Sequence, residues 1–332
     1  MRDLAVGDEL DQYRVVDLLA RSGMASVFKA EDQESGASVV LKVPHVQYES
    51  DVVFFERFQR EEEIGRRLAH PYIVRTLAPR EKSRVYLALE YVAGPSLRAT
   101  LRAHGSLETE RALDIARQLC EALSYLEERG VVHRDLKPEN VLLVPPDGKV
   151  KLLDFGIALL DSARRLTWAG LSGTLGTPDY MAPERIRGRR GDARTDVYAL
   201  GTVLYEMLTG RLPYQARNPA HLLHAKTHRS PTPPSAYLRD LGAPLEAIVL
   251  RSLALDPRDR YASAAEMLED LRAPCAPRPR TAKATRPIAL LPTWRRALLV
   301  LATAAGVASG AWLARPHPLE RPSALGASAR RP

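Results

Sequence analysis

The stretch VVHRDLKPENVLL, residues 131–143, is the most informative part of this sequence. It places the side chains of Asp135, Lys137 and Asn140 on a loop that leads into a short apolar strand pattern, VLLV (141–144). A single aspartate or lysine on a loop is usually only a solvated surface group. These polar side chains therefore gain meaning from the other motifs that accompany them in order along the chain.

Three further motifs accompany this loop. The triplet D-F-G (154–156) follows it, GTPDYMAPE (176–184) comes next, and upstream the strand pattern VVLK ends at Lys42. In this order the motifs resemble the catalytic loop H-R-D-L-K-x-x-N, the D-F-G and A-P-E triplets and the strand lysine of a protein kinase. The form HRDLKPEN is similar to that of the bacterial Hanks-type (eukaryotic-like) serine/threonine protein kinases. The resemblance covers about residues 13–272.

The periodicity of the apolar residues predicts an α+β chain with two lobes. Strand patterns lie at 13–20, 26–32, 38–43 and 85–92, and an amphipathic helix pattern lies at 51–69. After Gly94 the patterns become mostly helical. With the resemblance, this predicts the bilobal protein-kinase fold, with a small β-rich N-lobe at 13–92, a larger helical C-lobe at 93–272 and a cleft between them.

The C-terminal part of the chain predicts a membrane anchor. Residues 273–294 are rich in proline and basic residues and are expected to form an extended linker. Residues 297–314 are 18 residues without a charge, just long enough to cross a bilayer as a single transmembrane helix. The alternative for this Ala-rich stretch is a surface-lying or disordered segment. Residues 315–332 are expected to form a short disordered tail.

Basic residues are denser before the apolar stretch than after it. The positive-inside tendency therefore predicts a single-pass protein of the inner or plasma membrane whose kinase domain lies in the cytoplasm. The first residues contain no apolar run that would indicate a signal peptide.

The composition argues against nucleic acid as a partner. The 332 residues carry a formal net charge of +8, but part of this excess is concentrated near the linker, between Arg278 and Arg296. The sequence has neither zinc-finger spacing nor an aromatic RNA-binding signature. The chain has two cysteines, Cys120 and Cys275, which imply neither a disulfide framework nor a metal site and fit a reducing compartment.

The resemblance implies that the chain uses ATP and Mg²⁺ for phosphoryl transfer. Asp135 would accept or orient the proton of the incoming hydroxyl group, and Lys137 would contact the transferring γ-phosphate. Asn140 and Asp154 offer an amide oxygen and a carboxylate, the kind of ligand that a hard cation prefers, so they are the predicted metal ligands.

Lys42 lies in an apolar strand pattern, where an unpaired charge would be costly. By resemblance its partner is a glutamate of the helix at 51–69. Glu61, Glu62 and Glu63 are consecutive, and successive helix positions are turned by about 100°, so only one of them can face Lys42. We expect Glu61 to make the ion pair.

The turn expected to hold the phosphates of the nucleotide departs from the family pattern G-x-G-x-x-G-x-V. The predicted nucleotide-binding residues of this turn are Leu19, Ala20, Arg21, Ser22, Gly23, Met24, Ala25, Ser26 and Val27. Three positions expected to be glycine hold Ala20, Ser22 and Ala25. If one of them needs a positive φ, a residue with a Cβ atom costs roughly 1–2 kcal/mol, or about a tenfold loss of nucleotide affinity.

The stretch LALEYVAG occupies the position of the hinge that binds adenine in the family. By resemblance, Leu89 would lie at the back of the adenine pocket. The backbone of Glu90 and Val92 would hydrogen-bond adenine.

The resemblance also implies regulation by autophosphorylation. Ser172 or Thr174 is the expected site, and Arg134 would bind the added phosphate through charge-assisted hydrogen bonds. The reaction would occur in trans within a homodimer. Two structural roles are implied as well: an ion pair between Glu184 and Arg260, and hydrogen bonds from the catalytic-loop backbone to Asp196.

The sequence thus predicts a serine/threonine protein kinase that transfers the ATP γ-phosphate to hydroxyl groups of protein substrates. The first alternative is a pseudokinase, a scaffold or membrane-tethered adaptor with weak nucleotide binding, which the glycine-poor turn favours and the intact Lys42, Asp135, Asn140 and Asp154 disfavour. The second is a small-molecule kinase of similar shape, which the A-P-E segment disfavours because that surface supports an extended peptide.

Overall fold

The structure is a computed structural model that describes residues 2–49, 51–153 and 178–272. Several predicted features lie outside these residues. They are Asp154, the phosphorylation sites Ser172 and Thr174, the linker, the apolar stretch at 297–314 and the tail.

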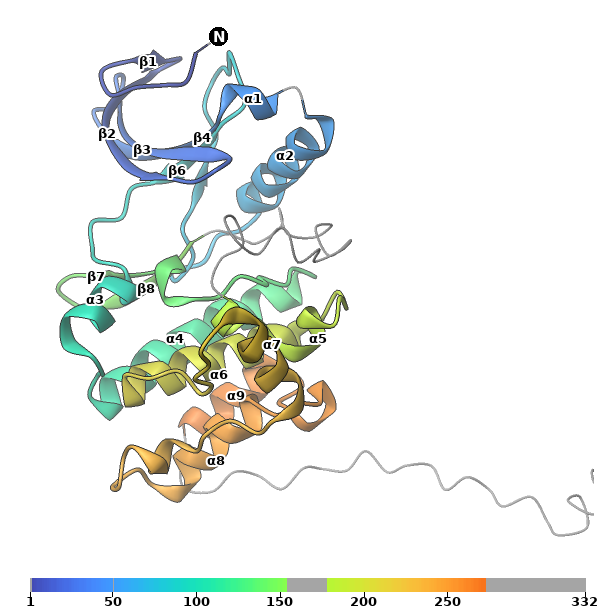
Figure 1. Ribbon diagram of the computed structural model, residues 1–332. Helices are drawn as coiled ribbons and strands as arrows, with labels where there is room; N and C mark the ends of the chain where they lie inside the picture. Colours follow the sequence, from blue (N-terminus) through green and yellow to red (C-terminus); the bar gives the residue numbers. More distant parts are fainter. Residues whose placement is uncertain (1, 50, 154–177, 273–332) are drawn as a thin grey trace, which may run out of the picture. The chain divides into compact units, whose positions relative to one another are not determined.

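The first part of the described chain forms an antiparallel sheet of six strands in the order β1-β2-β3-β4-β6-β5 (Figure 1). The strands are β1 Glu9–Leu10, β2 Tyr13–Arg21, β3 Ala25–Asp32, β4 Ser38–Pro44, β5 Thr76–Leu77 and β6 Leu87–Glu90. Strands β2, β3 and β4 follow the predicted patterns closely. Buried residues alternate with more exposed ones at the start of β2 and along most of β3 and β4. The buried face includes Tyr13, Phe28 and Leu41.

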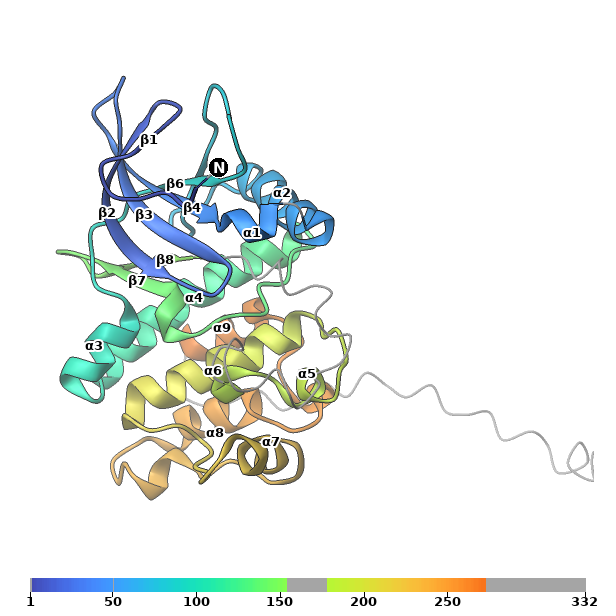
Figure 2. The same ribbon diagram turned by 45° about the horizontal axis from the view of Figure 1, so that its top comes forward.

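Two helices, α1 Val46–Glu49 and α2 Val52–Arg66, follow β4, and both views show α2 beside the sheet (Figures 1 and 2). The predicted helix at 51–69 ends earlier than expected. Its chain leaves the helix through tight hydrogen bonds from Arg67 N to Ile64 O and from Leu68 N to Gly65 O. The predicted strand at 85–92 is also shorter, because β6 pairs with β4 and β5 only as far as Glu90.

The second part of the described chain is mainly helical. Its helices are α3 Leu97–His104, α4 Thr109–Glu128, α5 Pro183–Ile186, α6 Ala193–Thr209, α7 Pro219–His228, α8 Ala243–Ser252 and α9 Ala264–Arg272. Helices α4 and α6 lie side by side and supply much of the buried core (Figures 1 and 2). A short hairpin, β7 Val141–Val144 and β8 Lys149–Leu152, follows the catalytic-loop sequence, as predicted.

The two lobes meet along the backbone of β8. Leu152 N donates to Tyr72 O at 2.8 Å, and Val74 N donates to Leu152 O at 3.0 Å. The segment that leads from α2 to β5 therefore pairs directly with the strand that follows the catalytic loop. Within the described ranges, no helix is long and apolar enough to span a membrane.

The expected ion pair between Glu184 and Arg260 lies in the interior of the C-lobe. Arg260 Nη1 and Nη2 donate to the two carboxylate oxygens of Glu184 at 2.9 and 2.8 Å, and the two side chains are only 0% and 7% exposed. Thr195 Oγ1 also donates to Glu184, and Arg260 Nε donates to Ala254 O. This bidentate pair joins the start of α5 to the segment before α9.

Removing one partner of this pair should leave a buried charge without a counter-charge. We expect Arg260→Met to lower the free energy of unfolding by about 3–5 kcal/mol, measured by urea denaturation of the full chain. The matched control is Arg258→Met, which removes an exposed ion pair with Asp256 and should change stability little. Equal destabilisation by the two substitutions would contradict this account.

Candidate active site

The catalytic-loop sequence brings the three predicted polar residues together. Lys137 Nζ lies 2.7 Å from Asp135 Oδ2. Asn140 Nδ2 donates to Asp135 O at 2.8 Å and to Asp135 Oδ2 at 3.1 Å. Asn140 ends the short 3-10 helix η1, Pro138–Asn140, immediately before β7. This turn points the amide and the ammonium group at one carboxylate.

The backbone of this loop is held by Asp196 of α6. Asp196 Oδ2 accepts from His133 N and Asp196 Oδ1 accepts from Arg134 N, both at 2.7 Å. Arg134 has a left-handed backbone with φ 64°, which is unusual for a residue other than glycine. Burial raises the pKa of Asp196, and the nearby His133 and the two N–H donors act in the opposite direction. The contact predicted for Asp196 is therefore present.

Lys42 contacts Glu61 rather than either neighbouring glutamate. Its Nζ lies 3.0 Å from Glu61 Oε1, and the Glu61 side chain is only 7% exposed. Glu62 instead pairs with Lys82 and Arg66, and the more exposed Glu63 pairs with Arg67. Lys42 lies opposite Val27 of β3 in the sheet, which places it close to the hairpin between β2 and β3.

The glycine-poor turn is a closed β2–β3 hairpin. Ser22 N donates to Ala25 O at 2.9 Å, and Ser22 Oγ accepts from Ala25 N at 3.0 Å and from Met24 N at 3.3 Å. Among described residues other than glycine, positive φ occurs only at Asp11 and Arg134. Ala20, Ser22 and Ala25 therefore avoid the cost of a left-handed backbone, and the serine side chain closes the turn.

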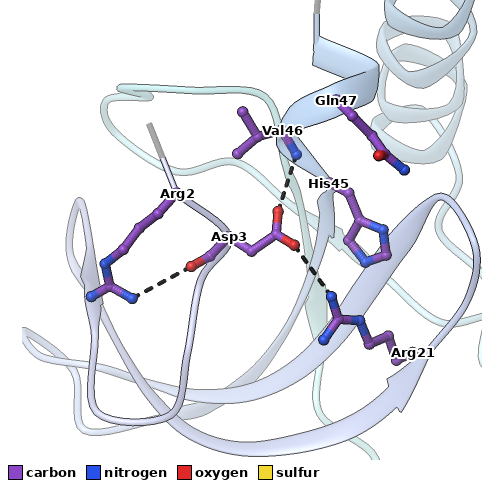
Figure 3. A pocket seen from close by; sticks show the side chains of 6 residues that line it. All are labelled: Arg2, Asp3, Arg21, His45, Val46 and Gln47. Carbon is purple, nitrogen blue, oxygen red and sulfur yellow. Dashed lines mark hydrogen bonds and ion pairs between the residues drawn. The ribbon is translucent and has the colours of Figure 1, made fainter.

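Two residues that were not predicted from the sequence, Asp3 and His45, contact this hairpin. Asp3 Oδ2 accepts from Arg21 Nη2 at 3.3 Å, and Asp3 Oδ1 accepts from Val46 N at 3.1 Å (Figure 3). His45 N donates to Met24 O at 2.9 Å, and the His45 ring lies 3.0 Å from Ser26 Oγ. Arg21, predicted to bind nucleotide, thus has its guanidinium group on Asp3.

The surface beside these contacts is a hollow of about 360 Å³ lined by Arg2, Asp3, Arg21, His45, Val46 and Gln47 (Figure 3). No sequence motif marks Asp3, because it lies ahead of the first predicted strand. His45 follows the apolar pattern of β4 and carries no signal of its own.

The predicted hinge residues differ in which backbone groups remain available. Glu90 N donates to Arg75 O at 2.9 Å, so its N–H is already used. The Glu90 carboxylate pairs with Lys151 at 2.5 Å. Val92 makes no backbone hydrogen bond to another described residue. Within the described residues, the backbone groups of Val92 are therefore the ones available to a ligand at this hinge.

Three arginines meet beside the catalytic loop. Arg185 Nη1 donates to Arg134 O at 3.3 Å, and burial together with the charges of Arg190 and Arg185 lowers the pKa of Arg134. Arg134 Nε is buried without a hydrogen-bond partner. Across the described ranges, none of the three guanidinium groups forms an ion pair with a carboxylate. Such a cluster is suited to binding an anion.

The residues present fit a magnesium ion on one side of the predicted site. Within the described residues both hydrogen bonds of the Asn140 side chain come from Nδ2, which leaves Oδ1 as a possible metal ligand. The other predicted ligand, Asp154, lies outside the described residues. No cluster of three or more histidine, cysteine, aspartate or glutamate side chains suited to a metal occurs among the described ones.

Fold and site together define the catalytic domain of a protein kinase. The model of the protein kinase domain matches residues 13–271, and the chain belongs to the protein kinase family.

The similar proteins include bacterial kinases. The chain is 37% identical over 268 residues to the serine/threonine-protein kinase PknB of Mycobacterium tuberculosis, covering 79% of this chain and 42% of PknB. It thus spans less than half the length of that relative. The solved kinase domain of Mycobacterium tuberculosis PknI is 30% identical, with a TM-score of 0.64, and the match covers 82% of this chain and 100% of that domain.

A third similar protein was solved with a nucleotide analogue. It is Rad53 in complex with AMP-PNP, with 28% identity and a TM-score of 0.64 over 77% of this chain and 64% of that one.

Proposed function

We propose that the chain is a serine/threonine protein kinase that transfers the γ-phosphoryl group of ATP to hydroxyl groups of protein substrates. The observation that carries this proposal is the convergence of Lys137 and Asn140 on the carboxylate of Asp135. Folding alone does not require this set of charges on one loop. The resemblance to kinases named as serine/threonine-specific supports the choice of acceptor.

Asp135 and Lys137 have different roles towards the acceptor hydroxyl group and the transferring phosphoryl group. The substrate oxygen attacks the γ-phosphorus, the bond to the ADP oxygen breaks, and the hydroxyl proton passes to the Asp135 carboxylate. The ammonium group of Lys137, already 2.7 Å from that carboxylate, is placed to offset negative charge on the transferring group. Removing either charge should slow the transfer without unfolding the loop, because Asp196 holds the backbone separately.

Lys42 and the hairpin act on the nucleotide side. Lys42, held by Glu61, would contact the phosphates, and residues 19–27 would cover them. Adenine would bind the backbone of Val92 and the carbonyl of Glu90. Asn140, with Asp154, would hold Mg²⁺, which offsets phosphate charge when bound. The AMP-PNP bound to the similar protein Rad53 supports ATP as the nucleotide.

The arginine cluster supports regulation by phosphorylation. We infer that Ser172 or Thr174 is autophosphorylated in trans, within a pair of chains, and that Arg134 binds the phosphate together with Arg185 and Arg190. Burial and the charges of Arg190 and Arg185 lower the pKa of Arg134, and a dianionic phosphate would offset this repulsion.

We also propose that residues 297–314 anchor the chain in the inner or plasma membrane as a single span, with the kinase domain in the cytoplasm. The support is the uncharged length of this stretch and the basic residues ahead of it.

Kinase activity should depend on the ion pair that positions Lys42. We expect Glu61→Gln to reduce phosphorylation of myelin basic protein about tenfold or more, and Asp135→Asn to reduce it by at least about 100-fold, measured with γ-labelled ATP. The matched control is Glu63→Gln, which changes an exposed neighbour in the same helix. Equal activity in the wild type and Asp135→Asn would contradict the proposed kinase activity.

The Ser22 side chain should support nucleotide binding by closing the hairpin. We expect Ser22→Ala to weaken binding of AMP-PNP about fivefold, measured by calorimetry. This loss corresponds to the net free energy of roughly one hydrogen bond. Ser35→Ala, in the turn at the other end of β3, is the control and should leave the affinity unchanged. Unaltered affinity in Ser22→Ala would mean that the hairpin is ordered by other contacts.

The arginine cluster should matter only when the chain is phosphorylated. We expect Arg190→Ala to lower the activity of the phosphorylated protein about tenfold, towards that of phosphatase-treated wild type, because a charge-assisted contact to phosphate is lost. Phosphatase-treated Arg190→Ala should match phosphatase-treated wild type.

The neighbouring substitution Arg189→Ala is the control for general charge, and it should leave both forms unaffected. Loss of activity in the unphosphorylated Arg190→Ala protein would argue against a phosphate-binding role.

A further inference from the structure

Lys226 of α7 is a charged side chain with no exposed surface, at 0% relative accessibility. The sequence PAHLLHAKTH around it has no feature that distinguishes this lysine from a surface residue of an amphipathic helix. Burying an ammonium group is costly unless its protons find acceptors. A lysine kept in this position therefore has a contact that offsets the cost.

The ammonium group binds backbone rather than a carboxylate. Lys226 Nζ donates to Pro178 O at 3.1 Å and to Asp179 O. Both carbonyls belong to the 3-10 helix η4, Pro178–Tyr180, which contains the first described residues of the stretch GTPDYMAPE (176–184). Among the described residues Lys226 has no ion pair with an acidic side chain. Its contacts therefore fix the conformation of η4 itself.

The groups that face Lys226 come from each neighbouring element. The centroid of the Tyr198 ring, on α6, lies 5.2 Å from Lys226 Nζ and 4.8 Å from Cζ of the Arg260 guanidinium group. Asp179 of η4 contributes the nearest acidic charge. At the next position of α7, Arg187 Nη2 donates to Thr227 O at 2.6 Å, which ties the end of α5 to α7.

Segment η4 is also joined to the catalytic loop. The Tyr180 hydroxyl contacts both Arg98 and Glu206, and Arg98 Nε donates to Glu139 Oε1 at 2.7 Å. Glu139 lies in η1, directly before Asn140. Lys226 thus holds η4 at one end while Arg98 connects its other end to the loop that carries Asp135.

The other side of η4 is open. Pro178 and Asp179 line a hollow of about 600 Å³ together with Leu222, which lies one helical turn before Lys226 on α7. The same short segment is therefore supported by Lys226 from the interior and available to another chain from the surface.

We propose that Lys226 is a positioning residue for the protein substrate: by holding the carbonyls of Pro178 and Asp179, it sets the surface on which a substrate segment lies when its serine or threonine reaches Asp135. The inference rests on the proposed kinase activity. It assigns substrate affinity, and not nucleotide binding, to Lys226.

We expect the contact to depend on pH. Burial, with Arg260 adding to it and Asp179 opposing it, lowers the pKa of Lys226 to about 7. Below this pH the side chain is a charged donor, and above it the neutral amine donates more weakly. The unfolded lysine keeps its ordinary pKa, so its burial opposes folding most strongly below pH 7, and this penalty decreases as the pH rises towards 10.5. Substrate binding and stability should therefore change in opposite directions.

The experiment compares the full-length wild type with Lys226→Met, Lys226→Gln and the control Lys149→Met, in which an exposed lysine of β8 is changed. The measured quantities are the KM values for myelin basic protein and for ATP, and kcat, between pH 6 and pH 8. Methionine fills the space without a donor, whereas glutamine keeps a donor that does not titrate in this range.

We expect the wild-type KM for myelin basic protein to rise about fivefold from pH 6 to pH 8 while the KM for ATP stays constant. Lys226→Met should show the high KM at every pH. Lys226→Gln should show a lower KM than Lys226→Met and a flat pH profile. Lys149→Met should behave as the wild type.

The proposal is overturned if Lys226→Gln keeps the pH dependence of the wild type, or if Lys226→Met binds the substrate normally at every pH. If Lys226→Met does not fold, the pH profiles of Lys226→Gln and of the wild type still test the proposal. A wild type that transfers no phosphate would instead defeat the proposed function, which separates the two failures.

Discussion

The catalytic loop depends on one buried carboxylate. Arg134 has a left-handed backbone, a conformation that costs roughly 1–2 kcal/mol for a residue with a Cβ atom. Asp196 offsets this cost by accepting hydrogen bonds from the two successive backbone N–H groups of His133 and Arg134. Because the backbone at His133 and Arg134 is fixed, Asp135 is placed where Lys137 and Asn140 both reach it. The predicted catalytic residues are thus arranged by Asp196, for which only a structural role is predicted.

The β2–β3 hairpin, which is predicted to bind the nucleotide, shows how hydrogen bonds can take the place of a missing sequence motif. Glycines in such a turn allow close backbone approach and positive φ. Here the turn has no positive φ, and Ser22 supplies hydrogen bonds that a glycine could not make. Asp3 and His45 add contacts from outside the hairpin. The glycine-poor sequence therefore forms a closed turn without a left-handed residue, so the missing glycines are not by themselves evidence for a pseudokinase.

Sequence reasoning was most successful where a motif fixes a chemical role. The contact of Lys42 with Glu61 could be expected, because a charge in an apolar strand pattern needs a partner and the resemblance points to Glu61. The ion pair between Glu184 and Arg260 was implied by the resemblance alone. Strand limits were less certain: β6 ends at Glu90, where its pairing with β4 and β5 ends. Pairing partners distant in sequence set that boundary, and periodicity does not report them.

The contacts of Asp3, His45 and Lys226 could not be predicted, for a common physical reason. Each binds backbone groups from another part of the chain, and a backbone N–H or carbonyl has no signature in the sequence. An alternating or helical pattern shows which face is apolar, but it does not show that a lysine within that face has two carbonyls within reach. Only the folded arrangement of η4 and α7 identifies Lys226 as a donor.

Asp196 and Lys226 apply the same principle with opposite charges. The carboxylate holds two N–H groups of the catalytic loop, and the ammonium group holds two carbonyls of η4. A buried ion pair with another side chain would fix one side chain against another and leave the backbone free to shift. A buried charge bound to backbone instead fixes the main chain directly, and removing it exposes two unsatisfied groups at once. Phosphoryl transfer requires mainly the correct placement of groups, and charges used in this way fix the backbone of both the catalytic loop and η4.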